Sequence, residues 1–135
     1  MSLEELIMKQ FPQATEQELS TLEDIYQKGS ELAINAYEIV QNEDATIEQL
    51  NKAVTYLTQV SELLNNADQI LQKYASTDPR VAYYYVKIAK IRYVATYAYN
   101  KLRDFASKLT MNQTQTAQPA TAVPATATTP TAGTA

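Results

Sequence analysis

Apolar residues recur along most of this chain at alternating steps of three and four residues. This spacing places them on one side of a helix, and it predicts α-helices rather than strands. The pattern covers one short segment, residues 3–11, and three long segments, residues 16–42, 47–75 and 79–110. In the last of these, the alternation by two that a strand needs is absent. The chain is therefore predicted to be all-α.

The residues at the predicted helix starts support these boundaries. Asp78 is a favoured N-cap, and Pro79 suits the first helical position, where its missing N–H costs nothing. Three further starts have the spacing of a capping box, in which a side chain and the backbone three residues away exchange hydrogen bonds. The three boxes are Ser2 with Glu5, Thr15 with Glu18, and Thr46 with Gln49.

The predicted connections between the long helices are short, at residues 43–46 and 76–78. Short connections force successive helices to lie antiparallel. Residues 1–110 are therefore expected to form an antiparallel three-helix bundle with a short additional N-terminal helix. Gly29 lies in the middle of a predicted helix, where glycine costs about 1 kcal/mol relative to alanine. It marks either a close approach of another helix at Gly29, Ala33 and Ala36 or a kink.

Residues 111–135 have a different composition, rich in alanine, threonine and proline and without charge. A segment of this kind cannot bury enough apolar surface to fold alone, so a disordered or extended tail is predicted. Asn112, Gln113 and Thr114 match the N-glycosylation pattern, which leaves a glycosylated stalk as another interpretation of the tail.

The composition excludes several classes of function. The chain has no cysteine and no histidine, and only two glycines. Disulfides, Cys/His zinc sites, histidine-dependent triads and glycine-rich phosphate loops are therefore excluded. We expect no enzymatic activity, no cofactor, no metal and no small-molecule substrate. No run of about 18 apolar residues is present, so no transmembrane segment is expected, and the first eleven residues lack the pattern of a signal peptide.

Charge is distributed unevenly along the chain. Residues 1–72 carry thirteen acidic residues and three lysines, a net charge of −10, and residues 73–110 carry eight basic and two acidic residues, a net charge of +6. This polarity can give one acidic and one basic surface. It can also be neutralised inside the bundle, or pair acidic and basic surfaces of different copies head to tail.

The helix predicted at 79–110 carries a stripe of lysines and tyrosines beside its apolar face. Cations replace counterions along a phosphate backbone, and phenol rings stack or donate hydrogen bonds. The stripe is therefore a candidate nucleic-acid surface, although a solvated face with tyrosines packed between neighbouring helices would give the same pattern. The candidate residues are Arg80, Tyr83, Lys87, Lys90, Tyr97, Lys101 and Lys108.

The short N-terminal helix carries a second candidate surface. At about ten residues it is too short to be stable alone in water. Its apolar face must therefore dock on its own bundle or on a neighbouring subunit. The candidate subunit-contact residues on this face are Leu3, Leu6, Ile7 and Phe11.

These features together resemble the small helical-bundle coat proteins of archaeal filamentous, rod-shaped and spindle-shaped viruses. The resemblance lies in the short all-helical bundle, the absence of cysteine, the basic-aromatic helix and the low-complexity tail. It implies a virion protein that polymerises with copies of itself into a helical shell and contacts double-stranded DNA without reading its sequence. The acidic first half departs from the basic pattern of many rod-shaped relatives. The alternative is a helical-bundle adaptor with no nucleic-acid role, located in the cytoplasm.

Overall fold

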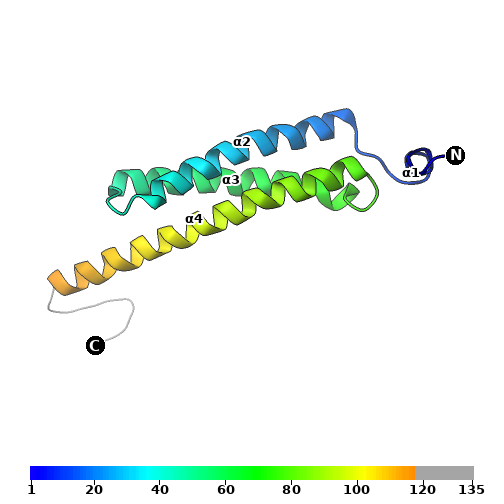
Figure 1. Ribbon diagram of the computed structural model, residues 1–135. Coiled ribbons are helices and arrows are strands. Elements are labelled where there is room, and N and C mark those ends of the chain that lie inside the picture. The colour runs from blue at the N-terminus through cyan, green and yellow to red at the C-terminus, as the bar shows by residue number, and fades with distance from the viewer. Residues whose placement is uncertain (118–135) are drawn as a thin grey trace. The chain divides into compact units, whose positions relative to one another are not determined.

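The computed structural model describes the backbone of residues 1–117 and the side chains of residues 1–109. Within this part of the chain all regular structure is α-helical, as the sequence predicts (Figure 1). The helices are α1 (Leu3–Gln10), α2 (Glu16–Gln41), α3 (Ile47–Tyr74) and α4 (Pro79–Ala117). The chain forms two compact units, Met1–Asn100 and Lys101–Ala135, and the boundary between them falls within α4.

The first three helices end within one residue of their predicted limits, but α4 does not. It continues to Ala117, whereas the sequence pattern places its end near Thr110. Residues 111–117 contain neither glycine nor proline, and methionine and glutamine are good helix formers. The next proline is Pro119, which disfavours helix at the residue before it. The rest of the predicted tail, residues 118–135, and the side chain of Asn112 lie outside the described residues.

All three predicted capping boxes are confirmed. At the start of α1, the Ser2 N–H donates to Glu5 Oε1 at 2.8 Å and the Glu5 N–H donates to Ser2 Oγ at 3.1 Å. Thr15 with Glu18 and Thr46 with Gln49 make the same reciprocal pair, at 2.9–3.1 Å. Each box satisfies amide groups that have no partner within the helix.

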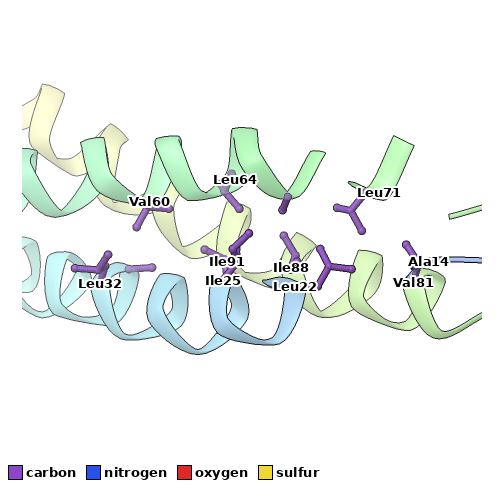
Figure 2. Packing of buried hydrophobic residues seen from close by; sticks show 12 residues of the cluster. Ala14, Leu22, Ile25, Leu32, Val60, Leu64, Leu71, Val81, Ile88 and Ile91 are labelled. Carbon is purple, nitrogen blue, oxygen red and sulfur yellow. The ribbon is translucent and has the colours of Figure 1, made fainter. Parts of the chain in front are cut away.

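The core of the first unit lies between α2, α3 and the first part of α4 (Figure 2). The contacts between these helices also give their directions. Lys73 near the end of α3 approaches Glu18 near the start of α2, so these two helices are antiparallel. Arg80 and Tyr97 on α4 meet Glu16 and Gln41 on α2, so α2 and α4 run in the same direction. The largest fully buried apolar side chains are Leu22, Ile88, Val60 and Val81.

Gly29 is buried and lies where α2 approaches α4 closely. A Cβ atom at this position would lie 3.1 Å from Ile91 Cδ1, closer than an ordinary van der Waals contact. Ala33 and Ala36, on the same side of α2, are also buried. Of the two interpretations of Gly29, the structure therefore favours close approach of a neighbouring helix.

This contact predicts a specific coupling between Gly29 and Ile91. In an Ile91→Val background, which removes Cδ1, Gly29→Ala is expected to raise the free energy of unfolding by about 1 kcal/mol, the gain in helix propensity. In the wild-type background the gain is smaller or reversed, because Cδ1 has to move. Urea unfolding of the four proteins measures the difference. An Ile88→Val background is the control, because no Ile88 atom lies within 4 Å of the added Cβ. Equal effects of Gly29→Ala in the Ile91→Val and wild-type backgrounds would contradict the close approach.

Candidate interaction surfaces

The turn between α3 and α4 holds the segment that joins α1 to α2. Asp78, which the sequence predicts as the N-cap of α4, is 1% exposed. One carboxylate oxygen accepts the Ala14 N–H at 3.0 Å, and the other accepts the Arg80 N–H at 2.9 Å. The Arg80 guanidinium also donates to both oxygens, at 2.9 and 3.1 Å. This buried carboxylate therefore links the start of α2 to the start of α4.

The side chain of Gln13 makes a second link at the same place. Its Nε2 lies 3.0 Å from the Thr77 carbonyl oxygen, 3.2 Å from that of Phe11 and 3.4 Å from that of Ile7. An amide nitrogen has only two hydrogens, so these acceptors share them. The end of α1 is thus attached to the α3–α4 turn.

Asp78 stays ionised at this junction even though it is buried. Burial raises the pKa of its carboxyl, but hydrogen bonds from the Arg80 guanidinium and from the Ala14 and Arg80 N–H groups lower it by more. The net result is a pKa of Asp78 below its usual value. The same hydrogen bond to Asp78 is the main reason that the pKa of Arg80 is raised.

The predicted nucleic-acid stripe lies largely along the contact between α4 and α2. Arg80 forms an ion pair with Glu16 of α2 at 3.4 Å. Lys87 Nζ lies 4.2 Å from the centre of the Tyr26 ring of α2, a cation–π contact.

Tyr97 extends the same contact further along α2. The Tyr97 hydroxyl accepts a hydrogen bond from Gln41 at 3.1 Å, and its ring lies 5.6 Å from that of Tyr37. Three of the predicted residues, Arg80, Lys87 and Tyr97, therefore contact the acidic helix of their own molecule.

Tyr84 lies next to this row of lysines and tyrosines, and its pKa shows the largest shift on the surface. The Tyr84 hydroxyl donates to Glu23 Oε1 of α2 at 2.6 Å. This hydrogen bond, burial of the ring and the charges of Glu23 and Tyr83 raise the pKa of Tyr84 to about 12. The bond also lowers the pKa of Glu23. Tyr83 packs its ring edge to face with Tyr84 at 5.5 Å but remains 59% exposed.

The remaining predicted residues are distributed over both units. Lys90 is exposed on α4 within the first unit. Lys101 and Lys108 belong to the second unit, where Lys108 is exposed and Lys101 is half-buried. Nucleic-acid binding by the seven residues stays a prediction. The structure brings Arg80, Lys87 and Tyr97 against α2, and Tyr83 lies beside Lys87 on α4.

A second face of α4, turned away from the buried residues except at Ala89, which lines the α3–α4 groove, was missed by the prediction from sequence. It carries a second set of positions with steps of three and four, and every one is exposed or half-buried. Val86 is 61% exposed and Tyr93 is 77% exposed. The signal is present in the sequence, but one helix with two apolar stripes is hard to separate from one broad stripe. We call this set the outer stripe, and its members are Ala82, Val86, Ala89, Tyr93 and Thr96.

The apolar face of α1 is also open to solvent. No residue of α1 is buried. Leu3 is 72% exposed, Leu6 39% and Phe11 48%, and Ile7 is half-buried. Docking of this face on its own bundle, one of the two alternatives from the sequence, is therefore not what the structure shows. Contact with a neighbouring subunit stays a prediction.

Other site types find little support in the part of the chain that the structure describes. Among the described residues, no group of three or more histidine, cysteine, aspartate or glutamate side chains could hold a metal ion. No described helix is both long enough and apolar enough to cross a membrane. A groove of about 400 Å³ between α3 and α4 is crossed by the ion pair of Arg92 with Asp68.

Comparison with known proteins provides no relative from which a site could be transferred. No protein-family model, curated protein or solved structure matches this chain. The roles of its residues therefore have to be inferred from the contacts of this chain alone. The resemblance to viral coat proteins stays a hypothesis.

The junction at Asp78 predicts a large loss of stability when its carboxylate is removed. At neutral pH, Asp78→Ala is expected to lower the free energy of unfolding by about 2–4 kcal/mol, because a cap is lost and the buried Ala14 N–H loses its acceptor. Asp78→Asn keeps an acceptor oxygen but loses the charge, so its effect is smaller. Urea unfolding measures both. Asp24→Ala, at an exposed position, is the control and should change stability by less than about 0.5 kcal/mol.

The same junction predicts how this effect depends on pH. Because the pKa of Asp78 is lowered by folding, its contribution is fully present above the unfolded pKa of about 3.9. It is lost as pH falls through the lower folded pKa. The difference in stability between wild type and Asp78→Asn should therefore narrow below about pH 4. A difference that is unchanged from about pH 7 to about pH 2.5 in denaturant titrations would contradict the assignment.

Proposed function

We propose that this chain is a self-assembling structural protein of the virion coat type, and that it contacts nucleic-acid phosphates without reading base sequence. The observation that carries the proposal is the open apolar face of α1. A helix of eight residues is not stable alone in water and needs a surface that covers its apolar side. Gln13 attaches the end of α1 to the α3–α4 turn, and the bundle of the same molecule leaves most of the apolar face of α1 exposed. A neighbouring copy can supply the cover.

Exposed tyrosines on α4 support assembly as well. Tyr83, Tyr85 and Tyr93 are 59%, 57% and 77% exposed. Tyrosine buries a large area on binding at a low cost in side-chain entropy, which is why it is enriched in interfaces. These side chains lie on different sides of α4, so they support more than one contact with other proteins rather than a single surface.

The proposed contact with nucleic acid rests on the charge of α4. From Pro79 to Arg103 the chain has basic residues and no acidic residue. Of the lysines predicted to bind nucleic acid, Lys90 is the exposed one in the first unit. Arg80 and Lys87 contact α2. Contact with phosphates would therefore use few cations and be weak and sensitive to salt. The corresponding location of the protein is the virion.

The engagement of Arg80, Lys87 and Tyr97 by α2 favours a second candidate function. Cations that are partly neutralised within the bundle contribute less to binding a polyanion. The chain would then be a helical-bundle adaptor whose exposed tyrosines bind a different protein. The two functions differ in what the purified protein does alone, since only a coat-type protein assembles without a partner.

Assembly of the purified protein tests the first proposal. Sedimentation velocity and negative-stain imaging over a range of concentrations should show growth from monomers to larger species. Leu6→Gln should weaken this association about tenfold or more, because a buried leucine contributes about 1.5–3 kcal/mol. Met8→Gln is the matched control, since Met8 is 67% exposed on a different side of α1. A protein that stays monomeric at every concentration would contradict the proposal and favour the adaptor.

Binding of random-sequence double-stranded DNA tests the nucleic-acid part separately. At low salt we expect measurable binding, with an affinity that falls steeply as salt rises. Lys90→Gln should reduce the slope of log affinity against log salt by about one. Lys28→Gln, on the acidic helix α2, is the control and should leave the slope unchanged. No binding at low salt would rule out this part while leaving self-assembly standing.

A further inference from the structure

The outer stripe of α4 differs from the corresponding faces of the other two long helices. It is apolar from Ala82 to Tyr93, and Thr96 is its one polar member. On α2, the positions opposite the core are exposed and mostly polar. They are Asp24, Gln27, Glu31, Ile34 and Glu38. On α3, where Val54 is 50% exposed at one side, the exposed positions opposite the core are polar. They are Asn51, Thr55, Thr58, Glu62, Asn65 and Gln69.

This difference indicates that the outer stripe is used for contact. The outward faces of α2 and α3 are ordinary solvated helix faces. A helix that is apolar on both sides is normally covered on both. On α4, one apolar side is covered by α2 and α3, and the other carries the exposed side chains of Val86 and Tyr93.

We infer that the outer stripe of α4 is the surface that receives α1 of a second copy of this chain. The inference rests on the proposed self-assembly and names the surface that it uses. The stripe from Ala82 to Thr96 is about 21 Å long at about 1.5 Å per residue, and α1 is about 12 Å long, so the stripe can hold the whole of α1. Both faces have apolar residues at steps of three and four, the spacing that lets two helices pack along a seam.

Charge favours α1 over a second α4 as the occupant. Lys90 flanks the outer stripe on one side and Arg92, which is paired with Asp68 of α3, on the other, and no acidic residue occurs between Pro79 and Asn100. Two copies of α4 packed face to face would bring like charges together, which is destabilising. The first turn of α1 carries Glu4 and Glu5, so α1 adds both apolar and acidic side chains to this basic helix.

The attachment of α1 indicates that the occupant comes from another copy. Gln13 Nε2 contacts carbonyl oxygens of both the end of α1 and the α3–α4 turn. Ala14, the next residue, is bonded to Asp78. These bonds hold α1 by its end, and none of its residues is buried against its own molecule.

An exchange of this kind generates assembly by itself. Each copy gives one α1 and has one outer stripe to receive another. The two surfaces are different, so a reciprocal exchange between two copies closes a dimer, whereas a head-to-tail exchange produces a ring or an open filament.

Cysteine cross-linking tests the contact directly, because the chain has no cysteine of its own. Leu6→Cys and Tyr93→Cys proteins are mixed under mild oxidation, and intact mass spectrometry counts the mixed disulfide. The matched control is Leu6→Cys mixed with Asn65→Cys, which places the thiol on the polar outer face of α3. Since a disulfide needs Cα atoms within about 7 Å, we expect the first mixture to give at least about five times more mixed disulfide. Sedimentation of each reduced variant must match that of the wild type.

Each other outcome overturns the inference in a recognisable way. Equal yields in the two mixtures, from a protein that assembles in sedimentation, would reject the outer stripe and leave the proposed function intact. An intramolecular disulfide in the Leu6→Cys, Tyr93→Cys double variant, at a concentration where it is monomeric, would show that α1 folds onto its own α4. A wild-type protein that never associates would reject the inference together with the proposed function.

Discussion

The interaction on which the first unit depends is the burial of one apolar stripe of α4 between α2 and α3. Ile88 and Ile91 of this stripe lie in the same core as Leu22 of α2 and Val60 of α3 (Figure 2). The absence of a side chain at Gly29 lets α2 approach Ile91. Because one side of α4 is used in this way, the apolar residues on its other side cannot reach the same core, and they face solvent.

The start of α2 and the short helix α1 have different roles in this arrangement. The start of α2 is fixed by Asp78, whose buried carboxylate serves α4 as well as the Ala14 N–H. The same junction attaches α1, through Gln13, without burying it. The fold therefore combines a well-packed bundle with a short helix whose apolar face is largely exposed. This combination is the physical basis of the proposed self-assembly.

Local signals in the sequence predicted much of this fold, and positions relative to neighbouring helices were harder to foresee. Capping boxes such as Thr15 with Glu18 depend only on residues three apart, so they could be identified directly. The neighbours of Lys87 could not be identified in this way, because helical spacing gives the side of a helix on which a residue lies but not which helix packs beside it. The structure places Lys87 over Tyr26 of α2. The open face around Tyr93 was overlooked because two apolar stripes on one helix are hard to separate from one broad stripe.

The central claim is that the apolar face of α1, which its own molecule leaves largely open, is covered by a second copy. Amide hydrogen exchange of residues 3–10, measured by mass spectrometry at low and high protein concentration, tests it most directly. An uncovered helix of eight residues opens readily, so its amides should exchange almost freely in dilute solution. At concentrations where the protein assembles, they should become protected, while core amides near Val60 keep the same protection throughout. Protection of α1 that does not change with concentration would contradict the account.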